Sequence, residues 1–138
     1  MNRLRSEDTE QMAVMDWAFY QTNKYPELKW LHHCPNGGSR NVREATKLKR
    51  MGVKAGISDL HLPYAKGQYH GLYIEMKYGK NVQQKSQTEF LNDMAEAGHY
   101  VATCYSARTA VEVIKSYVNL KADEPMPWKN NSVFKEGK

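Results

Sequence analysis

Apolar and polar residues alternate with two different periods along this chain, and the change of period marks the expected elements. Apolar residues three or four positions apart are typical of amphipathic helices. They recur over residues 7–22, 42–51, 86–98 and 106–120. Shorter apolar runs that end near Gly, Pro or Asn are typical of strands. Such runs occupy residues 28–34, 57–62, 71–78 and 100–105, so we expect an α/β fold with a mixed sheet flanked by helices.

Three serines mark where helices are expected to begin. Ser6 precedes an acidic first turn, which favours a helix start. Ser86 opens a segment with the spacing of a capping box, and Ser106 precedes the last apolar stretch. After Leu120 the periodicity stops. We therefore expect one domain over residues 1–120, followed by a C-terminal arm or a disordered tail over residues 121–138.

The most specific chemical pattern is an acid on one expected strand and an acid with a lysine on the next. Asp59 lies in Gly-Ile-Ser-Asp-Leu, and Ile74-Glu75-Met76-Lys77 follows. Because side chains alternate along a strand, Glu75 and Lys77 are expected on one face and Ile74 and Met76 on the other. Two carboxylates can hold a hard divalent cation, and a neighbouring ammonium can orient a water molecule. This pattern predicts metal-dependent hydrolysis of phosphodiesters.

A basic stripe is expected on the helix that precedes Asp59. Arg43, Lys47, Arg50 and Lys54 are spaced by four, three and four residues, which places them on one helical face if the helix extends that far. Arg40 adds to this cluster. Such a surface would bind a phosphate backbone with a strong salt dependence. The alternative is a solvated helix face, but its position beside Asp59 favours DNA binding.

Composition sets the broad class of protein. The chain has 138 residues, of which 41% are hydrophobic and 25% charged, and it carries a net charge of +5, which favours an anionic partner. No apolar run is long enough to cross a membrane, and the N-terminus lacks the apolar core of a signal peptide, so we expect a cytoplasmic protein. Cys34 and Cys104 are expected to be free thiols. His32, His33 and Cys34 lack a second ligand pair at zinc-finger spacing, so no zinc site is predicted.

Five ordered blocks of the chain resemble the VRR-NUC family of the PD-(D/E)xK nuclease superfamily. They are the first helix with Glu10, Pro35 to Arg40, Lys49 to Asp59, Glu75-Met76-Lys77, and Ser86-Gln87. Ser58 departs from the family pattern, in which Pro commonly precedes the Asp. The resemblance implies the αβββαβ core of that superfamily, in agreement with the expected order of elements.

The resemblance also implies roles for individual residues. Asp59, Glu75 and the backbone carbonyl of Met76 would ligate Mg²⁺ or Mn²⁺, and Lys77 would lie beside the attacking water. Glu10 resembles a helical acid that completes the metal shell, and Gln87 resembles a glutamine near the nucleophile or the scissile phosphate. Each residue has a structural alternative: Asp59 as a turn cap, Glu75 and Lys77 as an exposed pair, and Glu10 as a helix-start acid.

Together these observations predict a metal-dependent, structure-selective DNA endonuclease. Small single-domain members of the family look like dimeric enzymes that resolve four-way (Holliday) junctions, so a homodimer acting on branched DNA is expected, with a bacteriophage or bacterial source. A flap nuclease or a nonspecific DNA nuclease is the nearest alternative. A catalytically inactive module that binds branched DNA is an alternative of another class.

Overall fold

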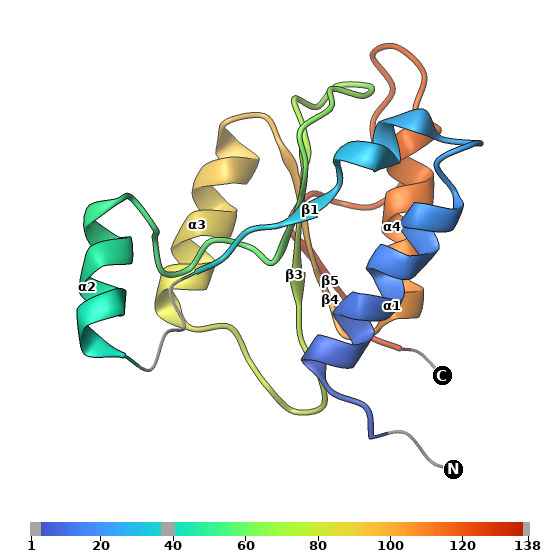
Figure 1. Cartoon of the computed structure of the whole chain (residues 1–138). Coiled ribbons are helices and arrows are strands. Elements are labelled where there is room, and N and C mark those ends of the chain that lie inside the picture. The colour runs from blue at the N-terminus through green and yellow to red at the C-terminus, as the bar shows by residue number, and fades with distance from the viewer. Residues whose placement is uncertain (1–3, 37–40, 137–138) are drawn as a thin grey trace.

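The computed structural model describes residues 4–36 and 41–136, which form a mixed sheet with helices on both faces (Figure 1). The strands lie in the order β1-β2-β3-β4-β5. Their bounds are β1 His32–His33, β2 Leu60–Leu62, β3 Leu72–Met76, β4 Tyr100–Cys104 and β5 Ser132–Phe134. The pairs β1/β2 and β2/β3 are antiparallel, while β3/β4 and β4/β5 are parallel. The predicted α/β fold with a mixed sheet is confirmed.

The helices divide between the two faces of the sheet. Their bounds are α1 Glu7–Tyr20, α2 Val42–Arg50, α3 Lys85–Glu96 and α4 Ala107–Val118, with a 3₁₀ helix at Pro26–Trp30. Figure 1 shows α1 and α4 on one face of the sheet and α3 on the other, with α2 standing away from the sheet beyond α3. The order of elements contains the expected αβββαβ core, with α2 inserted between β1 and β2.

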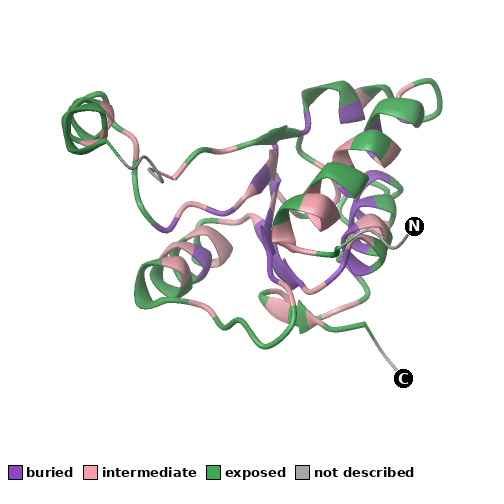
Figure 2. Cartoon of the chain, turned by 60° about the horizontal axis from the view of Figure 1, so that its bottom comes forward, coloured by how far each residue is buried: buried purple, intermediate pink, exposed green. Residues whose placement is uncertain are grey.

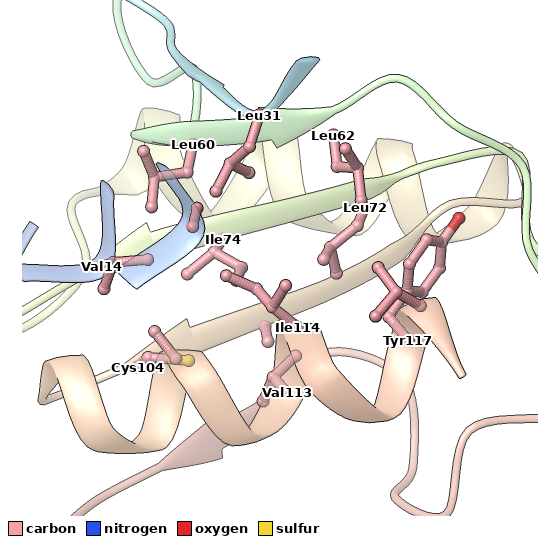
Figure 3. Packing of buried hydrophobic residues seen from close by; sticks show 14 of the residues in the cluster. Val14, Leu31, Leu60, Leu62, Leu72, Ile74, Cys104, Val113, Ile114 and Tyr117 are labelled. Atoms are coloured by element: carbon pink, nitrogen blue, oxygen red, sulfur yellow. The ribbon is translucent and has the colours of Figure 1, made fainter. Parts of the chain in front are cut away.

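The core lies between the sheet and the layer formed by α1 and α4. Leu72, Ile74 and Met76 of β3 are all buried and belong to this core. They meet apolar side chains of α4, including Ile114 and Tyr117 (Figure 3). Because side chains alternate along a strand, the residues between them face the layer of α3. The predicted alternation in β3 therefore directs Glu75 away from the apolar core.

Two of the three predicted helix starts are confirmed and one is displaced. Ser6 and Ser106 are the N-caps of α1 and α4, and each forms a capping box with a threonine three residues later. The start of α3 was predicted at Ser86, but Gln84 is its N-cap, and Gln87 completes the capping box. The reason is that Gln87 can reach back to the backbone N–H of Gln84, so a glutamine pair replaces the expected serine.

The predicted strand over residues 28–34 is wrong for its first half. Pro26 begins a 3₁₀ helix that extends to Trp30, and β1 contains only His32 and His33. Leu28 and Leu31 are buried while Trp30 is exposed. Buried residues three positions apart are what a 3₁₀ turn produces, and a short apolar run does not distinguish this spacing from a strand.

Helix α1 forms as predicted but buries a different face. Its buried residues are Val14 and Ala18, whereas Met12 and Phe19 are 57% and 72% exposed. The apolar residues of α1 thus lie on two sides of the helix. One side packs in the core and the other stays at the surface.

The segment after α4 packs against the sheet. Its strand β5 pairs with β4, and Met126 is buried in the core. The hydroxyl of Tyr100 donates to the carbonyl oxygens of Trp128 and Lys129 at 3.3 Å. A three-residue strand leaves no visible periodicity, so the sequence predicted an arm or disorder here without anticipating a strand.

Candidate active site

Four predicted side chains meet where β2, β3 and α3 come together, and we call this group the carboxylate corner: Asp59, Glu75, Lys77 and Gln87. Asp59 lies directly before β2, whose first residue, Leu60, pairs with Ile74 of β3. This register places Asp59 beside the end of β3. Its Oδ2 atom accepts a hydrogen bond from the backbone N–H of Met76 at 2.7 Å.

Gln87 connects the lysine to the glutamate. Its Oε1 atom accepts from the Lys77 ammonium at 2.8 Å, and its Nε2 atom donates to Glu75 Oε2 at 2.9 Å. The same Oε1 atom accepts from the N–H of Gln84 at 2.9 Å, so the amide orientation is fixed by two donors. Lys77 Nζ also lies 3.6 Å from Glu75 Oε2. The cap of α3 therefore positions the polar groups of the carboxylate corner.

Both carboxyl groups of the carboxylate corner resist ionisation. Glu75 is only 2% exposed, and its burial, with the nearby charge of Asp59, raises its pKa to about 8 against the opposing effect of Lys77. Burial also raises the pKa of Asp59, although the N–H of Met76 favours its charged form. Among the described residues, Glu75 Oε1 accepts from no N–H or O–H donor, and its carboxyl group pairs with that of Asp59, so the two groups share a proton when no metal is bound. A divalent cation would replace this proton and bind both carboxylates, so these residues fit a hard metal ion.

Glu10 is engaged elsewhere in the fold. Its carboxylate accepts from Arg5 at 3.1 and 3.2 Å and from the backbone N–H of Ala107, in the first turn of α4, at 2.9 Å. The hydrogen bond from Arg5 is the main cause that lowers the pKa of Glu10. These contacts tie the start of α1 to the start of α4. They engage both carboxylate oxygens of Glu10, whose metal contact stays a prediction.

Glu7 is the acid of α1 whose charge acts on the carboxylate corner. Its charge raises the pKa of both Asp59 and Glu75. One of its oxygens accepts from the side chain of Asn81 at 2.7 Å. Glu7 and Glu10, both in the first turn of α1, therefore have different partners, Asn81 for Glu7 and the N-terminus of α4 for Glu10.

His33 is a further neighbour that the sequence did not indicate. Its Nδ1 atom lies 2.8 Å from the carbonyl oxygen of Asp59 and 3.2 Å from Nε2 of Gln11. The adjacent Cys34 N–H donates to the same carbonyl at 2.9 Å. Pairing of β1 with β2 therefore holds the backbone of Asp59 from the side opposite β3.

Three of the five predicted DNA-binding residues share one face of α2, which we call the basic face: Arg43, Lys47 and Arg50. They line one shallow hollow with Thr46 and Met51. Lys54 lies outside the helix, because α2 ends at Arg50 and Gly52 has a φ of +107°. Arg40 falls outside the described residues. No residue of α2 is buried, as Figure 2 shows for the helix at the upper left.

The fold and the carboxylate corner define a nuclease-type protein, and the comparisons identify its family. The family model described as VRR-NUC domain matches residues 4–108, so the chain belongs to the VRR-NUC domain family. A solved structure named "VRR_NUC domain protein" is 34% identical, with a TM-score of 0.73, and the match covers 87% of this chain and 93% of that one. No curated protein matches the chain.

Family membership implies a nuclease-type function in DNA processing. Within the described part of the chain, no helix combines the length and apolar character needed to cross a membrane.

Proposed function

We propose that this protein is a Mg²⁺- or Mn²⁺-dependent DNA endonuclease whose metal ligands are Asp59, Glu75 and the carbonyl oxygen of Met76. The observation that carries the proposal is the buried pair of carboxyl groups of Glu75 and Asp59, which lie within hydrogen-bond contact of each other. Two buried carboxylates this close cannot both ionise at low cost unless a cation binds them. Lys77 is close by, so the metal ligands and a cation that can act on water lie together.

The bound metal ion would act as a Lewis acid that lowers the pKa of a water molecule and stabilises the charge on the phosphate. Lys77 then orients the attacking water and takes part in its proton transfer. Gln87 holds Lys77 in place through the 2.8 Å hydrogen bond and keeps one oxygen of Glu75 engaged. No nucleophilic side chain is needed, so hydrolysis proceeds without a covalent protein intermediate.

In this proposal Glu7, in place of Glu10, supplies the acid from α1. Its charge acts on both carboxylates of the carboxylate corner, whereas Glu10 is engaged by Arg5 and the N-terminus of α4. Glu7 would complete the shell through water molecules or hold a second cation. Glu10 instead fixes the relative position of α1 and α4.

The basic face of α2 is proposed to contact the DNA backbone. Arg43, Lys47 and Arg50 are all exposed and carry one sign of charge on a helix that buries nothing in the fold. Lys54 and Arg40 would extend this surface along the chain at either end of α2. Such contacts position a duplex without reading its sequence.

The proposed substrate is branched DNA, with a four-way junction as the preferred form and a homodimer as the active species. A dimer places two active sites across a symmetric junction. The apolar face of α4 is not available as a dimer surface, because Ala110, Val113, Ile114, Tyr117 and Val118 are buried in the core. The exposed apolar side of α1, with Met12, Phe19 and Tyr20, is a better surface for a second copy. A bacterial cytoplasm, with a phage-encoded gene, is the proposed setting.

Two alternatives remain distinct from this proposal. A flap nuclease or nonspecific nuclease would use the same carboxylate corner on other DNA. An inactive module that binds branched DNA would need only the basic face. The arrangement of Asp59, Glu75 and Lys77 favours an enzyme, because a binding module has no use for a buried pair of carboxylates beside a lysine.

The test compares cleavage of a four-way junction, a flap and a linear duplex by the wild type and by Asp59→Asn, each with Mg²⁺, Mn²⁺ or EDTA. We expect symmetric, metal-dependent nicks in the junction and a loss of at least about a thousandfold in Asp59→Asn. Binding to each DNA, measured in parallel, should be nearly unchanged in Asp59→Asn. Equal cutting of all three substrates would contradict junction selectivity, and binding without cutting under any metal condition would favour the inactive module.

A further inference from the structure

Three potential metal ligands that are separate from the carboxylate corner meet at the edge of the sheet, and we call them the histidine–cysteine cluster: His32, Cys34 and His61. His32 of β1 pairs directly with His61 of β2, and Cys34 follows β1. One ligand atom from each of the three residues lies within 4.8 Å of the other two. Among the described residues, this is the single group of three or more His, Cys, Asp or Glu side chains with that geometry.

The chemistry of this cluster differs from that of the carboxylate corner. Two imidazole nitrogens and one thiolate sulfur suit a borderline-soft cation such as Zn²⁺, whereas carboxylate and carbonyl oxygens suit Mg²⁺ or Mn²⁺. With metal–nitrogen and metal–sulfur bonds of about 2.0 and 2.3 Å, ligand atoms of a tetrahedral site lie roughly 3.5 Å apart. Small side-chain rotations, of roughly 1 Å at the ligand atoms, would close the present separations around one ion.

The surroundings of His32 favour metal binding. Its Nδ1 atom lies 2.9 Å from the carbonyl oxygen of Trp30. A carbonyl oxygen can only accept, so in the neutral ring this contact places the proton on Nδ1 and leaves Nε2 free to bind a metal. A backbone carbonyl bonded to the other ring nitrogen is the usual support of a metal-bound histidine.

Aromatic packing explains only part of the arrangement. The ring of His61 stacks on Tyr73 with centroids 4.0 Å apart, and its centroid lies 5.4 Å from that of His32 in an edge-to-face contact. These contacts account for the two rings. They give no reason for the Cys34 thiol to lie beside both nitrogens.

We propose that His32, Cys34 and His61 bind one Zn²⁺ ion, with a water molecule in the fourth position. Binding releases the proton of the Cys34 thiol to solvent, and the thiolate forms the metal–sulfur bond. The ion would fasten β1 to β2. Because Cys34 N–H and His33 Nδ1 both contact the carbonyl oxygen of Asp59, this clamp would also steady the backbone at the carboxylate corner.

The test uses Co²⁺ as a spectroscopic probe on the purified full chain. Tetrahedral cobalt bonded to sulfur gives an intense visible spectrum and a thiolate-to-cobalt charge-transfer band in the near ultraviolet, neither of which an oxygen-only site produces. We expect both signals at one cobalt per chain in the wild type and in Asp59→Asn. We expect the charge-transfer band to disappear in Cys34→Ser and both signals to weaken strongly in His32→Asn.

His70→Asn is the matched control, since it removes another exposed histidine by the same substitution. It should retain the full cobalt spectrum. With excess Mg²⁺ present to occupy the carboxylate corner, Zn²⁺ should raise the Tm of the wild type and of His70→Asn progressively with its concentration, and should raise that of His32→Asn far less. His32 is exposed, so its variant should fold even if Cys34→Ser does not.

Two results would overturn the proposal. One is a wild-type protein without the charge-transfer band, which would leave the cluster as aromatic packing only. The other is a band that persists in His32→Asn at full intensity, which would place the cobalt on a different set of ligands. Neither result bears on the nuclease proposal, because the test measures no cleavage.

Discussion

The carboxylate corner and the basic face differ in how the fold holds them. Glu75 and Lys77 are almost completely buried, and hydrogen bonds from β3 and α3 fix every member of the corner. Helix α2 buries none of its residues and stands away from the sheet (Figures 1 and 2). A nine-residue helix with so little tertiary support is marginal in water. The core of the fold therefore holds the carboxylate corner in place, whereas it gives α2 little support.

This difference matches the demands of the two proposed tasks. Hydrolysis needs ligands and a lysine held within a fraction of an ångström, which buried elements joined by hydrogen bonds provide. Contact with a phosphate backbone tolerates movement, and DNA can supply the support that the core does not give to α2.

Lys77→Ala should reduce the single-turnover rate of cleavage by roughly a hundredfold to ten-thousandfold, because the proton transfer at the attacking water loses its partner. Metal affinity, read from the Mg²⁺ dependence of the rate, should change little. Gln87→Ala should show a smaller loss, since it frees Lys77 without removing it. If Lys77→Ala cleaves DNA at the wild-type rate, Lys77 has only a structural role beside Glu75.

Glu7→Gln should reduce cleavage more than Glu10→Gln does, by about tenfold or more. Glu7 acts electrostatically on Asp59 and Glu75, whereas Glu10 bonds Arg5 and the N-terminus of α4. Glu10→Gln should instead lower Tm. Cleavage rates and thermal melts of both variants measure these two effects. A greater loss of cleavage in Glu10→Gln than in Glu7→Gln would show that Glu10 is the helical acid of the site.

Reversal of Arg43 and Lys47 to Glu should weaken DNA binding and reduce the slope of log Kd against log salt by roughly two. The metal-dependent rate at saturating DNA should stay close to wild type. Lys115→Glu with Lys121→Glu is the matched control, because both lysines are exposed and the net charge changes equally. Equal weakening by the two pairs would show that overall charge, and not the basic face, attracts DNA.

The N-caps of α2 and α4 provide a direct comparison of the two regions. Ser106→Ala should cost about 1 to 2 kcal/mol and lower Tm by several degrees, because α4 packs in the core. Asn41 caps α2 by accepting from the N–H groups of Arg43 and Glu44. Asn41→Ala should leave Tm nearly unchanged and weaken DNA binding instead. A large fall in Tm for Asn41→Ala would show that α2 belongs to the cooperative core.

Glu75→Gln should stabilise the metal-free protein in a pH-dependent way. The folded protein raises the pKa of Glu75 from 4.5 to about 8, mainly through burial. Between these values the unfolded chain releases the proton more readily, so the stability that the protonated carboxyl contributes is present at low pH and is lost as pH rises toward 8. The Tm difference between Glu75→Gln and wild type should therefore grow over this window.

Mg²⁺ should reduce the Tm difference between Glu75→Gln and wild type, because it binds the charged form of Glu75 and offsets the free-energy cost of burying that charge. The exposed acid Glu112 on α4 offers a control, and Glu112→Gln should show no such trend. A constant Tm difference across the pH range would mean that Glu75 is charged and compensated without a metal.

The sequence could place residues whose environment is set by local patterns. The alternation of Ile74, Glu75, Met76 and Lys77 was enough to separate the core face of β3 from the face of the carboxylate corner. Ser6 and Ser106 were recognised as caps because a cap depends on contacts within one turn. Residues 26–31 were misread because a short apolar run fits both a strand and a 3₁₀ helix.

The fold class thus followed from periods of two and 3.6 residues, and the family was recognised by the resemblance of five ordered sequence blocks. Tertiary structure decided the contacts between segments far apart in the chain. The packing of α1 against α4 brought Glu10 to the N-terminus of α4, and the pairing of β1 with β2 brought His61 to His32 and Cys34. The physical reason is that the direction of a helix face and the register of two strands are fixed by the burial of the whole core, which no local pattern contains.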